Sequence, residues 1–150
     1  MPQSLDQVLL HVVFSTKNRE RWLEDELRDE MHAVFGGVAE GLGATLLKAG
    51  SVEDHVHLLF VLPRTVTIAD LVMNLKTGSA KWLKGRSTHF GGFRWQAGYG
   101  VFSIGASQRE DLERYFARQK EHHQKVSFQE EYRKFLDRYR VSYDERYVWD

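Results

Sequence analysis

The chain repeats one pattern that restricts its fold. An apolar segment with the two-residue spacing of a β-strand is followed by a segment with the three- and four-residue apolar spacing of a helix. The expected strands cover residues 7–15, 44–52, 55–63 and 99–104, and the expected helices cover residues 24–42, 67–83, 108–124 and 128–139. This β-α-β-β-α-β order with a helical tail predicts an α+β fold of the ferredoxin-like (split β-α-β) type.

In that fold an antiparallel sheet carries helices on one face, followed here by C-terminal helices. We expect the other sheet face to stay free of helices, and that face, or a groove where the tail helices cross it, to meet a partner. Three expected helix starts carry a capping signal, a Ser or Thr followed three residues later by an acidic residue. They are Thr67 with Asp70, Ser107 with Glu110 and Ser127 with Glu130.

Composition limits the protein class. With 150 residues and 42% hydrophobic composition, we expect one globular domain over residues 1–150. The absence of cysteine excludes a disulfide scaffold and thiolate metal sites and fits a reducing cytoplasm. We expect a cytoplasmic protein, because no segment resembles a signal peptide and every apolar run falls short of the ~20 residues that span a bilayer. The 21 basic and 21 acidic residues balance, so a site for a polyanion must be local.

His55 and His57 lie one residue apart in the most apolar run of the chain, residues 55–62. Residues two apart on a strand share a face, so both imidazoles project the same way. Neutral imidazole is a common metal ligand and also a common buried structural residue. From the pair alone both interpretations stay open.

A second local feature is a basic segment interleaved with aromatic residues and free of acidic residues. Cations can follow a nucleic-acid backbone while flat rings stack on unpaired bases, which favours single-stranded DNA or RNA. An ordinary solvated helix face followed by core aromatics explains the same pattern. The candidate DNA-binding residues are Lys76, Lys81, Trp82, Lys84, Arg86 and Arg94.

Tyr115 and Gln119 are four residues apart on the expected helix 108–124, so they lie on one helix face. A phenol is a weak nucleophile at its ordinary pKa, and becomes useful when a metal and cations polarise the phosphate it attacks. The amide oxygen of Gln119 is a neutral ligand that suits Mg²⁺ or Mn²⁺. Tyr115 is equally interpretable as a packing residue. His122 and His123 could touch phosphate or the metal, but we expect them to face solvent near the helix C-terminus. We expect His11, His32 and His89 to be structural.

Together these residues resemble the HUH endonucleases. His55-Val56-His57 is similar to their histidine–hydrophobe–histidine signature, and Tyr115 with Gln119 is similar to their single-tyrosine helix motif. Length and element order resemble the single-tyrosine HUH transposases of the smallest bacterial insertion sequences, and their relatives associated with repetitive extragenic palindromes. The segments 95–100 and 141–149 also agree with this family.

The resemblance implies a function and a set of site residues. His55, His57 and Gln119 would bind Mg²⁺ or Mn²⁺, and Tyr115 would attack a DNA phosphate to give a 5′-phosphotyrosine and a free 3′-OH. The substrate would be single-stranded DNA beside a hairpin. The protein would be a homodimer, in which the Tyr115 helix can act on the partner's histidines.

Three other functions remain open. A domesticated hairpin-binding protein would keep the fold but no longer transpose. An RNA-binding module of the ferredoxin-like class is disfavoured, because residues 55–63 lack its basic-glycine-aromatic strand signature. A metal-binding regulator would bind metal through His55 and His57 and be indifferent to Tyr115→Phe.

Overall fold

The computed structural model describes residues 2–123 and 125–150. Its centre is a four-stranded sheet in the order β2-β3-β1-β4, in which every neighbouring pair is antiparallel. The strands are β1 (Val8–Ser15), β2 (Thr45–Ser51), β3 (His55–Leu62) and β4 (Gly100–Ile104). Strand order and element order confirm the predicted ferredoxin-like α+β fold.

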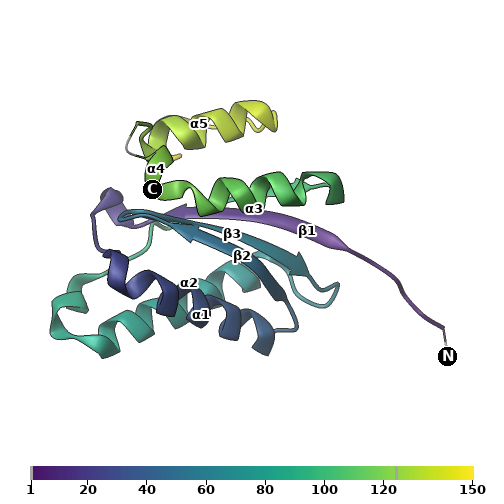
Figure 1. Cartoon of the computed structure of the whole chain (residues 1–150), viewed down its shortest axis with the longest axis horizontal. Helices are drawn as coiled ribbons and strands as arrows, with labels where there is room; N and C mark the ends of the chain where they lie inside the picture. Colours follow the sequence, from purple (N-terminus) through teal and green to yellow (C-terminus); the bar gives the residue numbers. More distant parts are fainter. Residues whose placement is uncertain (1, 124) are drawn as a thin grey trace.

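Helices cover both faces of the sheet (Figure 1). On one face lie α1 (Asp25–Gly41) and α2 (Ile68–Arg86), and on the other lie α3 (Arg109–Ala117), α4 (Gln119–His122) and α5 (Phe128–Arg138). Short 3-10 turns occur at Lys17–Arg19, Thr88–Gly92 and Ala106–Gln108. The expectation of a sheet face free of helices is therefore wrong, because the tail helices pack onto it.

The face beneath α1 and α2 holds the larger apolar core. Alternate residues of β1 and β3 point into it, because side chains two apart on a strand share a face. On the helix side of this core, α1 contributes Met31 and Phe35, and α2 contributes Leu71 and Leu75, all fully buried. The strand residues of this core are Leu10, Val12, Phe14, Val56, Leu58 and Phe60.

The opposite face has a smaller apolar cluster. Val13 of β1 and Phe102 of β4 pack against four residues of α5, which are Phe128, Tyr132, Phe135 and Leu136. The helix α3 approaches the sheet at Gly50, where an added Cβ would collide with the backbone carbonyl of Phe116. This close approach brings the α3 side chains down to the sheet.

Two of the three predicted caps are confirmed. The side-chain oxygens of Thr67 and Ser127 accept hydrogen bonds from the backbone N–H groups of Asp70 (3.0 Å) and Glu130 (3.2 Å). The cap predicted at Ser107 is wrong: α3 begins two residues later, and Gln108 Oε1 instead accepts from the N–H of Gly105 at 2.8 Å.

The expected helix 108–124 is broken. Arg118 leaves the helical region (φ −103°, ψ 14°), which separates α3 from the short α4. Tyr115 and Gln119 therefore lie on two successive helices rather than on one helix face. Within the described residues, no helix combines the length and the apolar character needed to cross a membrane.

Candidate functional site

The two strand histidines lie on the face covered by α3 to α5. Both rings are fully buried, and their centroids are 5.2 Å apart. The predicted shared orientation is confirmed. In the register of the sheet His55 lies opposite Ser15 at the end of the antiparallel pair, and His57 lies opposite Val13 two residues farther in.

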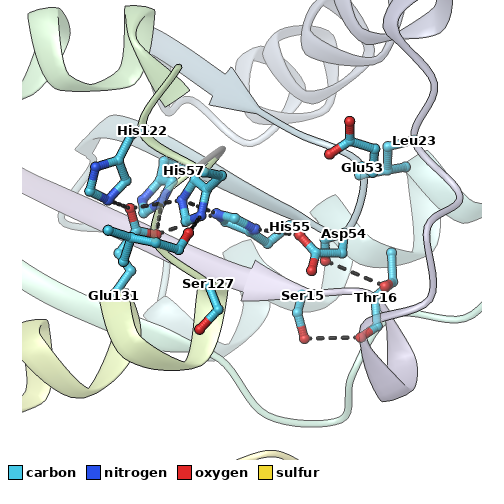
Figure 2. Close-up of polar contacts among 12 residues, drawn as sticks. Ser15, Thr16, Leu23, Glu53, Asp54, His55, His57, His122, Ser127 and Glu131 are labelled. Atoms are coloured by element: carbon cyan, nitrogen blue, oxygen red, sulfur yellow. Dashed lines mark hydrogen bonds and ion pairs between the residues drawn. The ribbon is translucent and has the colours of Figure 1, made fainter. Parts of the chain in front are cut away.

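A carboxylate from α5 reaches these histidines. Glu131 is buried, and its Oε1 lies 2.7 Å from His57 Nε2 and 3.3 Å from His55 Nε2. Its Oε2 lies 3.0 Å from His123 Nε2 and 3.2 Å from His122 Nε2. Figure 2 shows Glu131 facing the row of imidazoles, with Asp54 at the far end beside His55. One carboxylate therefore joins the strand pair to the tail helices.

Tyr115 of α3 belongs to the same cluster. Its O–H donates a very short hydrogen bond to Glu131 Oε2, and the oxygen lies 3.1 Å from His122 Nε2. The centroids of the Tyr115 and His57 rings are 5.8 Å apart. A single chain thus already brings the phenol and the strand histidines onto one carboxylate.

Gln119 is buried beside this cluster. Its amide nitrogen lies 3.5 Å from the backbone carbonyl of Tyr115. Among the described residues its Oε1 has no hydrogen-bond partner, and it makes no hydrogen bond to His55 or His57. A buried acceptor without a donor fits a place beside a bound cation, although the role predicted for Gln119 as a ligand stays a prediction.

Glu131 was not predicted, and contact of His123 with the site was the less favoured alternative. The side chain of His123 is only 7% exposed, so the expectation that it faces solvent is wrong, whereas His122 is 29% exposed. His55, His57, His123 and Glu131 each offer a ligand atom, and these atoms lie within 4.8 Å of one another. Imidazole nitrogens and a carboxylate are a donor set that fits a divalent metal ion.

The missed carboxylate left a signal in the sequence. Because Ser127 sets the start of α5, Glu131 falls on the buried stripe between Phe128 and Phe135. A charged residue on the apolar stripe of a helix needs a buried partner. Nothing in local spacing shows that the partner is a histidine pair 74 residues earlier.

Burial and charge shift the pKa values of the cluster in opposite directions. Burial raises the pKa of the Tyr115 phenol, and the Glu131 carboxylate raises it further. Burial opposes ionisation of Glu131, but His57, His123 and His55 outweigh it and hold that pKa well below its usual range. Burial lowers the pKa of His57, whereas Asp54 and Glu131 overcome burial and raise the pKa of His55. The phenol is therefore neutral and the carboxylate ionised.

The predicted DNA-binding residues lie elsewhere. Lys76 Nζ donates to the backbone carbonyls of residues 96, 97 and 98 at 2.7, 3.2 and 2.7 Å, which gives this ammonium a structural task. Arg86 stacks on Trp82 at 5.0 Å and pairs with Glu30 at 2.5 Å. Lys81 and Lys84 are exposed on α2 and Arg94 is exposed beyond it. Because α2 covers the other sheet face, the structure does not bring its residues to the histidines.

Different cations lie near the phenol. Tyr115 and Glu131 line a cavity of about 450 Å³ together with Lys134 and Arg138 of α5. Ammonium and guanidinium groups bind phosphate oxygens. These two cations share the lining of the cavity with the carboxylates of Asp111 and Glu131.

Known proteins are similar to this chain in fold and in sequence. The profile of the family "Transposase IS200 like" matches residues 4–119. The ISDra2 transposase TnpA of Deinococcus radiodurans is 25% identical over 118 residues, which cover 75% of this chain and 84% of that protein. A crystal structure of a Deinococcus radiodurans R1 protein described as a transposase has a TM-score of 0.62 at 26% identity, covering 79% of this chain and 98% of that one.

A second solved structure is similar in fold alone. It is a REP-associated tyrosine transposase bound to a REP hairpin, with a TM-score of 0.61 at 12% identity, covering 84% of this chain and 74% of that one. The profile match spans all four strands and the helix that carries Tyr115. The chain belongs to the IS200-like transposase family.

Proposed function

We propose that this transposase cleaves and rejoins single-stranded DNA beside a hairpin, with Tyr115 as the nucleophile. The observation that carries the proposal is the phenol of Tyr115 sharing one carboxylate, Glu131, with His55 and His57. In a family of transposases, a tyrosine held against the two strand histidines has the placement that a nucleophile needs.

The cleavage step exchanges one phosphodiester for another. The Tyr115 oxygen forms a bond to phosphorus while the bond from phosphorus to the 3′ oxygen breaks, which leaves a 5′-phosphotyrosine and a free 3′-OH. The phenolic proton is lost as the new bond forms and the leaving 3′ oxygen gains one, so atoms and charge balance, while Glu131 Oε2 orients the phenol through the hydrogen bond that it already accepts. The covalent link conserves the energy of the phosphodiester, so rejoining needs no ATP.

The remaining side chains bind and orient the strand. A divalent ion such as Mg²⁺ or Mn²⁺, held at His55 and His57 with Gln119 beside them, would polarise the scissile phosphate when bound. Lys134 and Arg138 would hold the flanking phosphates in the cavity that leads to Tyr115. The exposed Lys81, Lys84, Arg86 and Arg94, with Trp82, would contact the hairpin farther away.

We also propose a DNA hairpin as the substrate and a homodimer as the assembly. The solved REP-associated transposase is bound to a hairpin, which supports a hairpin as the DNA recognised here. We propose a homodimer, in which the tyrosine helix can serve either its own histidines or those of the partner. Because one chain already joins Tyr115 to Glu131, we expect the arrangement within one chain to be populated.

The experiment is cleavage of a hairpin oligonucleotide with a single-stranded flank, in MnCl₂, followed by a denaturing gel. With a 3′ label we expect a retarded protein–DNA band, and with a 5′ label a shortened free fragment. Tyr115→Phe should lose both, while Tyr147→Phe, at a largely exposed tyrosine, should keep both. An unchanged band from Tyr115→Phe would refute the nucleophile, and a native shift without any covalent band would support the hairpin-binding alternative.

A further inference from the structure

The Nε2 atoms of three imidazoles converge on the carboxylate of Glu131. The Nε2 atoms of His55 and His57 face Glu131 Oε1, and the Nε2 of His123 faces Glu131 Oε2 at 3.0 Å. The Nε2 atoms of His55 and His123 are themselves only 3.0 Å apart. These groups come from β3, from the end of α4 and from α5, so the convergence is built by the fold.

The Nδ1 atom of each ring forms a hydrogen bond to another group of the protein. His55 Nδ1 lies 2.7 Å from the Asp54 carboxylate, and His123 Nδ1 lies 2.6 Å from the carbonyl of Val126. Both partners are acceptors, so each Nδ1 carries a hydrogen. His57 Nδ1 lies 2.8 Å from His11 Nε2, and either ring can carry the hydrogen of this bond. Holding Nδ1 in this manner is how proteins orient metal-binding histidines.

If these rings are neutral, their lone pairs therefore lie on Nε2. With hydrogen on Nδ1, His55 and His123 bring two Nε2 lone pairs together at 3.0 Å, beside an ionised carboxylate. Buried acceptors that face each other without a donor are unfavourable. A positive charge among these atoms removes the conflict.

We propose that Nε2 of His55, His57 and His123 and the carboxylate of Glu131 are the ligands of one divalent metal ion, so that α5 completes the metal centre. This proposal extends the proposed function. The ion has a role in catalysis only if the chain cleaves DNA as proposed above. The ligands from α4 and α5 lie beyond residues 4–119, the segment matched by the family profile. Gln119 is then not needed to hold the ion, and acts as a positioning residue beside Tyr115.

The ligand set predicts which ion is preferred. Mg²⁺ favours oxygen ligands and keeps several waters, whereas imidazole favours first-row transition metals. Three imidazoles and one carboxylate therefore select Zn²⁺ or Mn²⁺ over Mg²⁺. Because Glu131 Oε2 also holds the Tyr115 O–H, the same side chain links the ion to the phenol.

The test measures metal binding by the EDTA-treated full chain without DNA. We expect calorimetry with ZnCl₂ and MnCl₂ to show one site per chain, and MgCl₂ to bind at least about tenfold more weakly than MnCl₂. The signal of free Mn²⁺ in electron paramagnetic resonance should fall in parallel. Glu131→Gln and His123→Gln should each weaken Mn²⁺ binding at least about tenfold.

The control is His89→Ala, which should bind Mn²⁺ as the wild-type chain does, and Gln119→Ala is the discriminating variant, which should lose less Mn²⁺ affinity than either ligand variant. His89 is exposed and lies outside the cluster. Wild-type Mn²⁺ affinity in both Glu131→Gln and His123→Gln would overturn the proposal, as would equal loss in Gln119→Ala. Circular dichroism of each metal-free variant verifies folding, and the two independent ligand variants keep the test valid if one fails to fold.

Two further outcomes also decide the matter. Failure of the wild-type chain to bind any of the three ions would show that protons, rather than a metal, neutralise the cluster. Wild-type metal affinity with increased DNA cleavage in Glu131→Gln would show that Glu131 obstructs the site. Metal binding that survives in Tyr115→Phe, whatever its cleavage, separates this proposal from the proposed function.

Discussion

The two faces of the sheet hold different chemistry in equally buried surroundings. Beneath α1 and α2, alternate strand residues meet helix side chains that are almost all apolar. Beneath α3 to α5, the intervening strand residues include His11, His55 and His57; His57 contacts both His11 and Glu131, and Glu131 also holds Tyr115. One face stabilises the fold by removing apolar surface from water, and the other holds titratable groups at fixed positions.

The difference has an energetic consequence. Apolar burial contributes about 25 cal/mol per Å², so the α1/α2 face provides most of the stability. Buried ionic groups regain in attraction roughly what they lose in desolvation, and they contribute little net stability. Substitutions on the first face should therefore cost stability, and substitutions on the second should cost activity.

The largest expected effect is on the polar face. His57→Ala should lower formation of the covalent protein–DNA product at least about 100-fold, because it removes a proposed metal ligand from the centre of the cluster. Binding of the hairpin should change little, because the variant keeps every cation that we propose to contact DNA. The denaturing gel and a native gel measure the two quantities, and a variant that still cleaves normally would break the division between the faces.

On the apolar face, Phe35→Ala should lower the free energy of unfolding by about 3–5 kcal/mol, since it leaves a cavity in the larger core. Urea denaturation followed by circular dichroism measures this loss. At low temperature, cleavage per folded molecule should match the wild-type chain. A strong loss of cleavage by fully folded protein would show that the two faces are coupled.

Gly50→Ala tests the contact between the sheet and α3. Its new Cβ would meet the Phe116 carbonyl, so we expect a loss of about 1–3 kcal/mol in the free energy of unfolding, together with reduced cleavage as Tyr115 is displaced. Gly37→Ala, with open space around its Cβ, is the control and should be neutral or stabilising. Equal behaviour of the two variants would contradict the close approach.

The smallest effect concerns the cations of α2. Lys76→Met should lower the free energy of unfolding by about 1–3 kcal/mol, because it leaves the carbonyls of residues 96 to 98 without their donor. Lys84→Met, at an exposed position, should leave stability unchanged and reduce the salt dependence of hairpin binding. Fluorescence anisotropy at several salt concentrations measures the second effect. A reversed pattern would assign the DNA contact to Lys76.

Much of the fold was predictable because it depends on neighbours in the chain. The spacing of apolar residues predicted all four strands and located α1, α2 and α5 within a few residues. The caps at Thr67 and Ser127 followed from local hydrogen bonding. The break at Arg118 was missed, because residues 108–124 carry no glycine or proline to mark it.

The site was predicted only in part. The two-residue spacing of His55 and His57 was enough to place both rings on one strand face, and resemblance to a family indicated Tyr115. Glu131 was missed, and His123 was expected to face solvent, because their partners are 74 and 68 residues away in the chain. Their roles depend on how the tail helices pack, which local spacing does not encode.

The order of strands and helices, and the shared direction of the two strand imidazoles, follow from backbone geometry repeated over a few residues, so the amino-acid order was sufficient for them. Which side chains share the buried space above those imidazoles depends on long-range packing. The helices α3 and α5 pack on this face of the sheet and bury it. This packing places Glu131 in contact with His57 and Tyr115.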